Sequence, residues 1–149
     1  SDLRLPPSSR LAATAAEIPV LAIAGEGADE ASAARLRDAR IEVALVRRDV
    51  AGRLDLDAAL TLLAARGLTR IMCEGGPRVA ARLIGQGLAD EVLIFTAPEP
   101  LGREGVLGLD EDAAALLAAA DHYRLAETRM IGADRLTRYE RVVSCARAL

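Results

Sequence analysis

Residues 68–98 read LTRIMCEGGPRVAARLIGQGLADEVLIFTAP, and their pattern predicts a strand, a turn, a helix and a second strand. The apolar run at 71–73 is typical of a short buried strand. Gly75 and Gly76 end it, because glycine permits backbone angles that a side chain would block. Pro77 suits the first turn of a helix, where its missing N–H group costs nothing. The apolar residues of the helix recur at helical spacing, namely Val79, Leu83 and Ile84. Gly85 and Gly87 mark its end, and residues 92–96 form the strand that follows.

The glycine turn is also a candidate anion site. A helix that begins at such a turn presents unpaired backbone N–H groups and the positive end of its dipole, which together favour a phosphate or a diphosphate. Glu74 comes at the carboxyl end of the predicted strand, where open α/β sheets place their ligands. On the pattern alone, the alternatives are a plain strand-to-helix connection and a solvent-facing Glu74 carboxylate.

The composition excludes several classes of protein. The 149 residues are 52% hydrophobic and 2% aromatic, which suffices for one globular domain with an aliphatic core. A net charge of −3 and the scarcity of aromatic rings argue against a nucleic-acid-binding surface. No apolar run approaches the length of a membrane span and no signal peptide opens the chain, so we expect a cytoplasmic protein without membrane contact.

Few residues offer metal or acid–base chemistry. Cys73, Cys145 and the single histidine, His122, are too few and too far apart for a zinc site, so we expect no metal and two free thiols. His122 is expected to be exposed beside a strand and not to act as a general base. No other residue stands out as catalytic. Three arginines could approach a phosphate, although a solvated basic loop is the default expectation for them: Arg47, Arg48 and Arg53.

The rest of the chain alternates between predicted strands and helices, which is typical of a parallel sheet covered on both faces. Before residue 68, strands are predicted at 20–24 and 41–46, and helices at 29–39 and from Asp55 or Asp57 to Ala65. After residue 98, the predicted elements are a glycine- and proline-rich loop at 100–108, a helix at 110–120 and a hairpin of strands 123–130 and 136–143. The loop is either a flap over a site or a plain connector.

The order of these motifs resembles that of one enzyme family. The segments EGGP at 74–77, GLADE at 87–91 and the opening DLRLPPSSRL at 2–11 are similar to the reductase domain of the bacterial bifunctional riboflavin-biosynthesis deaminase/reductase. That domain is dihydrofolate-reductase-like. The resemblance implies an α/β fold with a mostly parallel sheet, helices on both faces and a C-terminal antiparallel hairpin.

The resemblance also implies a reaction and a set of site residues. Family enzymes use NADPH to reduce the ribose of a phosphoribosylamino-pyrimidine to the ribitol form. By position, Glu74 matches the glutamate on the substrate side of the cleft. The turn and helix start that hold the cofactor's phosphates match Gly75, Gly76, Pro77, Arg78, Val79 and Ala80.

One departure from the family bears on activity. The family's domain has a segment before the point that matches residue 1, so we expect residues 1–149 to be a single reductase-like domain without that segment and without a deaminase domain. Such a chain is expected to be inactive alone, and its unpaired strand edges favour a homodimer. The alternatives are a related NADPH reductase with another small substrate and a noncatalytic dimerisation or regulatory module on the same fold.

Overall fold

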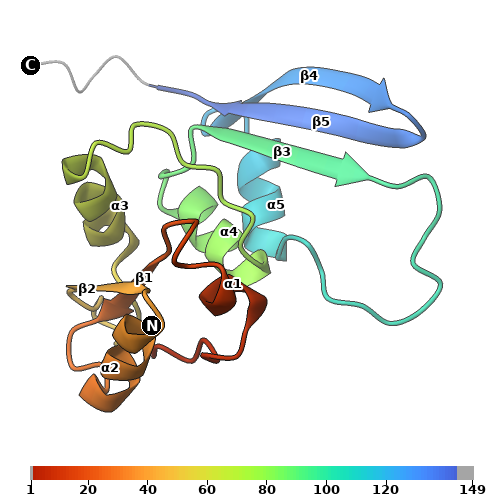
Figure 1. The fold of residues 1–149 in the computed structure, drawn as a ribbon. Helices are drawn as coiled ribbons and strands as arrows, with labels where there is room; N and C mark the ends of the chain where they lie inside the picture. Colours follow the sequence, from red (N-terminus) through yellow and green to blue (C-terminus); the bar gives the residue numbers. More distant parts are fainter. Residues whose placement is uncertain (1, 144–149) are drawn as a thin grey trace, which may run out of the picture. The chain divides into compact units, whose positions relative to one another are not determined.

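A computed structural model describes residues 2–143 of the chain. These residues form two compact units, which divide between Ile71 and Met72. Figure 1 shows that each unit contains both strands and helices, which confirms the α/β class. The expectation that residues 1–149 form a single domain stays a prediction.

The first unit is built on two parallel strands, β1 (Leu21–Gly25) and β2 (Glu42–Val46). Their register runs from Leu21 opposite Glu42 to Gly25 opposite Val46, so both carboxyl ends lie at the same edge of the pair. The helices of this unit are α1 (Arg10–Ala13), α2 (Glu30–Asp38) and α3 (Leu56–Ala65), of which α2 and α3 pack against β2.

Short polar side chains determine where the helices of this unit begin. Asp29 accepts a hydrogen bond from the backbone N–H of Ser32 at 2.8 Å, and Asp55 accepts one from Ala58 at 3.0 Å. Each satisfies an N–H group that has no partner within its own helix. The sequence predicted Asp29 as the start of α2 and offered Asp55 or Asp57 for α3; the structure selects Asp55.

The core of the first unit lies between α1, α2 and the strands. Leu36 and Ile41 are each 1% exposed, and two alanines, Ala12 and Ala15, join them. Burial of such aliphatic side chains is the main stabilising term in a domain with few aromatic rings. Smaller contributions come from half-buried side chains packed against this cluster: Leu3, Leu5, Val20, Ala22, Ala39 and Val43.

The second unit is a three-stranded antiparallel sheet with two helices on one face (Figure 1). Its strands, in the order in which they pair, are β3 (Glu91–Thr96), β5 (Asp134–Arg141) and β4 (Tyr123–Ile131). Helices α4 (Pro77–Gly85) and α5 (Glu111–Ala118) pack on the face that carries Val92, Ile94 and Tyr139. The buried side chains between the layers are Ile84, Ala113, Leu117 and Tyr123.

Two expectations about the sheet are wrong. Residues 71–73 form no strand, and the side chain of Met72 is 79% exposed. The strand after α4 pairs antiparallel with β5, so the expected mostly parallel sheet is wrong: among the strands of residues 2–143, the only parallel pair is β1 with β2. An apolar triplet becomes a strand only where a neighbouring strand pairs with it, and in residues 2–143 no strand pairs with 71–73. The closing hairpin of β4 and β5 is confirmed.

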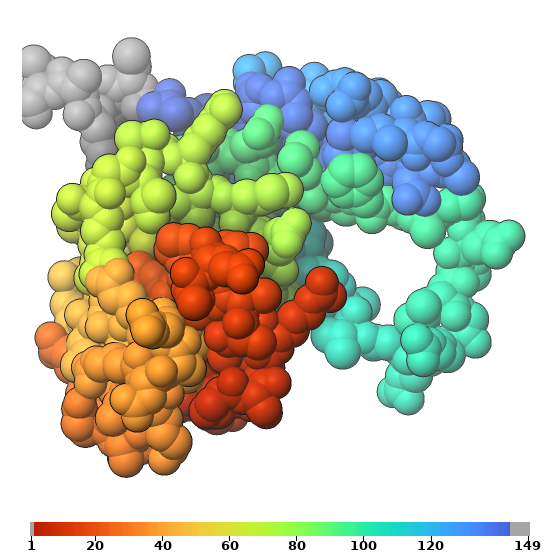
Figure 2. All heavy atoms as spheres, in the orientation of Figure 1, coloured from red at the N-terminus to blue at the C-terminus, as the bar shows by residue number. Residues whose placement is uncertain are grey.

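The loop between β3 and α5 is confirmed as well. Residues 97–110 contain neither helix nor strand. In Figure 2 this segment, coloured teal, forms an arch that stands off from the strand before it and the helix after it. Three large apolar side chains on the arch are exposed, namely Leu101, Val106 and Leu107. A role as a flap over a site stays a prediction.

No helix within residues 2–143 is both long enough and apolar enough to cross a membrane.

Candidate functional site

The predicted site residues are contiguous and lie at the start of α4, within the second unit. Glu74, Gly75 and Gly76 form the exposed segment that leads into the helix. Gly76 is the residue that caps it, and Pro77 is its first residue, as predicted. Within the first turn Arg78 and Val79 are exposed, whereas Pro77 and Ala80 are half-buried. The structure therefore presents this segment as an open surface.

Helix α4 begins differently from the other described helices. In residues 2–143, four of the five helices begin with a side chain that accepts a hydrogen bond from the first turn: Ser9, Asp29, Asp55 and Asp110. Helix α4 has Gly76 at this position, no side-chain cap and no acidic residue in its first turn. Its positive end is thus not neutralised by a carboxylate of its own first turn.

The backbone N–H groups of this turn are partly available. The N–H groups of Val79 and Ala80 donate to the Gly76 carbonyl at 3.0 and 3.2 Å. Among the hydrogen bonds of residues 2–143, none uses the N–H groups of Gly76 or Arg78. Pro77 has no N–H group, so two donors remain at the tip of the helix, which is the arrangement that binds an anion.

The reason for the two glycines differs from the predicted one. Neither Gly75 nor Gly76 has a positive φ, and the φ of Gly76 is −61°, which any residue can adopt. The expectation that they supply special backbone angles is therefore wrong. A Cβ atom on Gly75 would lie 3.3 Å from the Cβ of Val79, whereas a Cβ on Gly76 would meet nothing within 4 Å. Gly75 allows close packing, and Gly76 leaves open space in front of the helix.

The two charged residues of the site are both exposed. Within residues 2–143, no ion pair joins Glu74 to Arg78, and neither takes part in another ion pair or side-chain hydrogen bond. Arg78 lies in the first turn of α4, where its guanidinium is free to add a charged contact to an anion held by the helix. The thiol of Cys73 is exposed nearby, and Cys145 lies outside the described residues.

The three arginines after β2, which the sequence offered as possible phosphate contacts, pair with carboxylates and carbonyls of the protein. Arg47 pairs with Asp55 at 2.7 Å, and Arg53 pairs with Asp49 at 3.0 Å. Arg48 donates hydrogen bonds to the carbonyls of Glu26 and Gly52, at 3.0 and 2.9 Å. These arginines organise the loop after β2, a role that the sequence did not reveal, because two of these partners are backbone carbonyls.

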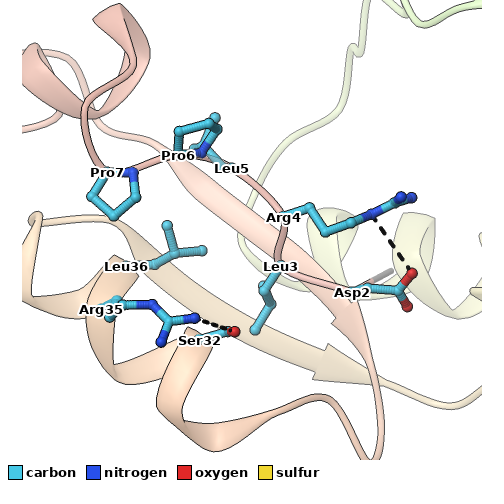
Figure 3. A pocket seen from close by; sticks show the side chains of 9 residues that line it. All are labelled: Asp2, Leu3, Arg4, Leu5, Pro6, Pro7, Ser32, Arg35 and Leu36. Carbon is cyan, nitrogen blue, oxygen red and sulfur yellow. Dashed lines mark hydrogen bonds and ion pairs between the residues drawn. The ribbon is translucent and has the colours of Figure 1, made fainter.

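Two cavities lie in the first unit, and neither is lined by a residue of the 74–80 segment. One, of about 310 Å³, lies between the N-terminal segment and α2; in Figure 3 its two arginines have partners, Ser32 for Arg35 and Asp2 for Arg4. The other, of about 560 Å³, lies between α3 and the end of β2 and is lined by Glu26, Val46, Arg47, Ala58, Thr61, Leu62, Ala65 and Arg66.

Two other titratable side chains of the second unit lie outside this segment. His122 is exposed, with Nε2 at 3.9 Å from Asp121, as expected for a residue beside a strand. Tyr123 donates a hydrogen bond to the Ala89 carbonyl at 2.9 Å, and its burial raises the pKa of the phenol. In residues 2–143, no group of three or more His, Cys, Asp or Glu side chains is placed to hold a metal ion.

Comparisons with known proteins give this arrangement a context. The chain is 32% identical over 88 residues to the riboflavin biosynthesis protein RibD of Escherichia coli K12, an alignment that covers 56% of this chain and 23% of that protein. Its structure is similar to that of a pyrimidine reductase-like protein from Corynebacterium diphtheriae, with a TM-score of 0.72 and 22% identity over 97% of this chain and 59% of the other. The structure is also similar to that of RibD from Acinetobacter baumannii, with a TM-score of 0.64 and 18% identity over 93% of this chain and 35% of the other.

These matches establish the fold and the family. The two solved structures confirm the expected α/β fold. The chain spans about a quarter of the E. coli relative and less than two thirds of each of these solved chains. The family model described as the RibD C-terminal domain matches residues 1–136. The chain therefore belongs to the RibD C-terminal domain family.

Proposed function

We propose that this chain is part of an NADPH-dependent reductase of riboflavin biosynthesis, and that the start of α4 binds the diphosphate of the cofactor. The substrate would be a phosphoribosylamino-uracil, whose ribose is reduced to the ribitol form. Membership of the family supports the reaction class. The observation that carries the site is the start of α4, which has no acidic cap and faces open space at Gly76.

The residues present fit the phosphates of such a cofactor. The N–H groups of Gly76 and Arg78 supply two donors, the helix dipole adds partial positive charge, and the Arg78 side chain adds a full one. Gly75 lets the turn pack closely on Val79, and Ala80 completes the first turn with a small side chain. When bound, NADPH would supply the hydride; this segment would hold and orient it.

The remaining roles follow from the resemblance. Glu74, directly before the turn, would contact the substrate and not the cofactor. We also propose that the chain acts as a homodimer.

The test is NADPH binding to the 149-residue chain, measured by titration calorimetry on the wild type and three variants. In Gly76→Val a side chain fills the space in front of the helix, while the backbone angles of residue 76 suit valine, so the variant should fold and bind NADPH roughly tenfold more weakly or worse. Gly108→Val is the matched control, because a Cβ there also meets nothing within 4 Å; its affinity should be unchanged. Glu74→Gln should bind NADPH like the wild type.

Two results would contradict the proposed site. If the wild-type chain does not bind NADPH, the start of α4 is not sufficient as a cofactor site. If Gly76→Val binds NADPH as tightly as Gly108→Val does, the cofactor does not approach the helix at Gly76. A circular dichroism spectrum of each variant confirms that its fold is retained.

A further inference from the structure

The arch at residues 97–110 starts and ends at one end of the second unit (Figure 1). Strands β3 and β4 run in the same direction, because each pairs antiparallel with β5. Helix α5 packs on the sheet and is joined to the start of β4 by the short segment 119–122, so α5 itself starts where β3 ends. The arch leaves the sheet after Thr96 and returns at Asp110, the cap of α5, so both of its feet lie at this end.

The candidate cofactor site lies at the same end. Helix α4 packs on the same face of the sheet and is joined to the start of β3 by residues 86–90, so α4 also starts where β3 ends. The helices α4 and α5 contact each other. Gly76 and both feet of the arch therefore belong to one end of this unit.

Few contacts hold the arch in place. Among the hydrogen bonds and ion pairs of residues 2–143, none involves a residue from 97 to 109. Loops of this length without secondary structure are uncommon in compact domains and are often lids or binding loops. A segment with so few bonds changes its position at little cost in free energy.

One foot of the arch is nevertheless anchored. Leu109 is half-buried against the core of the second unit, and Asp110 accepts a hydrogen bond from the backbone N–H of Ala113 at 2.9 Å. These contacts fix residues 108–110, so the part of the arch that can close is 97–107. Gly108, the control position for cofactor binding, lies outside this part.

The closing part offers apolar side chains and a small excess of negative charge. Leu101, Val106 and Leu107 are 64%, 86% and 71% exposed, so all three are available for contact with a ligand. Two glutamates and one arginine supply its charges: Glu99, Glu104 and Arg103. The closing part therefore suits an apolar, uncharged group better than a phosphate.

We infer that residues 97–107 close over the nicotinamide half of a cofactor held at the start of α4, and that Leu101, Val106 and Leu107 contact the reduced ring. This inference rests on the proposed function and deepens it, because it assigns the part of the cofactor that the start of α4 does not hold. It also gives a use to the exposed apolar side chains of the arch.

The chemistry of the cofactor decides which half the arch covers. The diphosphate joins the two halves of NADPH, so one half extends from the start of α4 in each direction. The reduced nicotinamide ring is uncharged and has apolar faces, whereas the adenosine half carries a further phosphate that the negative charge of the arch would repel. Closure of an apolar segment over the nicotinamide also keeps water away from the hydride.

The test compares two compounds by titration calorimetry on the 149-residue chain: NADPH, and 2′-phospho-ADP-ribose, which lacks the nicotinamide ring. The arch variant combines Leu101→Ser, Val106→Ser and Leu107→Ser, all at exposed positions, so it should fold. We expect its affinity for NADPH to fall roughly tenfold and its affinity for 2′-phospho-ADP-ribose to stay unchanged. Leu125→Ser is the matched control, because Leu125 is 60% exposed near the start of β4, at the other end of the sheet.

Two further readouts follow the ring and the arch. The chain has no tryptophan, so the fluorescence of the reduced nicotinamide can be measured directly; its emission should rise on binding to the wild type and not to the arch variant. Arg103 is exposed within the closing part, and trypsin cleavage after it can be followed by mass spectrometry. NADPH should slow this cleavage, whereas 2′-phospho-ADP-ribose should not.

The possible failures are distinguishable. If the wild-type chain binds neither compound, the cofactor site at α4 is wrong and this inference falls with it. If the wild type binds both compounds equally well, or if the arch variant loses affinity for both alike, the arch does not bind the nicotinamide although the site at α4 stands. Cleavage after Arg103 that NADPH does not slow leads to the same conclusion.

Discussion

At the scale of single residues, Arg48 illustrates how a charged side chain can be structural. Its guanidinium lies over Gly25 and bonds to the carbonyls of Glu26 and Gly52. It thereby ties the end of β1 to the loop that follows β2. The arrangement requires that residue 25 have no side chain.

We therefore expect Gly25→Ala to destabilise the protein. The new Cβ would lie 2.6 Å from Cζ, 2.7 Å from Nε and 2.8 Å from Cγ of Arg48, so the arginine must move and lose its carbonyl bonds. Overpacking of this kind costs about 1–3 kcal/mol. Urea denaturation measures the change in the free energy of unfolding. In an Arg48→Ala background the same substitution should cost clearly less, and an equal cost in both backgrounds would show that Arg48 is not responsible.

The sequence predicted the start of a helix well, but it did not predict a contact between residues that are distant in the chain. Gly76 and Pro77 could be placed at the start of a helix because proline and glycine have strong positional preferences there. The contact between Gly25 and Arg48 joins residues far apart in sequence and ends on backbone carbonyls, so no local pattern contains it. The same limit applies to Gly76, whose role is to leave open space and not to adopt a special φ.

At the scale of elements, three helices end with the same hydrogen-bonded motif. After α2, α3 and α4, the residue two places past the cap donates back to the helix: Ile41 to Leu36, Leu68 to Leu63 and Leu88 to Leu83, at 3.0, 3.1 and 2.9 Å. The motif needs a left-handed residue before the donor. Gly67 and Gly87 provide it with φ of 84° and 64°, but α2 uses Arg40 with φ of 64°.

We expect Arg40→Gly to stabilise the protein by about 0.5–1 kcal/mol, because glycine adopts this conformation without the steric cost that a side chain incurs. The side chain of Arg40 is exposed, so little packing is lost. Gly67→Ala is the reciprocal variant and should destabilise by about 1 kcal/mol. Thermal denaturation followed by far-UV circular dichroism measures both. Changes of the same sign in the two variants would contradict the interpretation.

Helices were easier to predict than strand pairing. The starts of α2, α3 and α5 follow from an aspartate that caps each of them, and glycines follow α3 and α4. Residues 71–73 have the composition of a strand but no strand pairs with them in the described structure. Pairing depends on residues elsewhere in the chain, so composition over three residues does not determine it.

At the scale of the whole molecule, the acidic groups with lowered pKa values belong to one unit. A hydrogen bond from the side chain of Ser32 lowers the pKa of Asp29. Hydrogen bonds from backbone N–H groups lower the pKa of two further aspartates: Arg53 donates to Asp49, and Ala58 donates to Asp55. A hydrogen bond from Arg66 likewise lowers the pKa of Glu42. All four carboxylates lie in the first unit.

This distribution predicts that the first unit is the more sensitive to acid. A carboxylate with a lowered pKa binds its proton less readily in the folded state than in the unfolded state. It therefore stabilises the fold at pH values above its ordinary pKa of about 4, and this stabilisation is lost as the pH falls from there through the lower pKa of the folded state. Both tyrosines, Tyr123 and Tyr139, lie in the second unit. During acid titration, the far-UV circular dichroism signal should therefore begin to fall at a higher pH than tyrosine fluorescence changes.

A matched variant isolates the carboxylates. In the double variant Asp29→Asn and Asp55→Asn, both side chains can still cap their helices but no longer titrate. The circular dichroism transition should move to lower pH, while the fluorescence transition stays where it is. Coincident transitions in the wild-type chain would show that the two units lose their structure together.

The contact between Gly25 and Arg48 also has an evolutionary consequence. Glycine is required at position 25 only while a long side chain at position 48 occupies the space above it. A relative that acquires alanine or serine at position 25 should carry a shorter residue at position 48, and the intermediate sequence with only the first change should be under selection to acquire the second. The two positions are therefore expected to covary although they are distant in sequence.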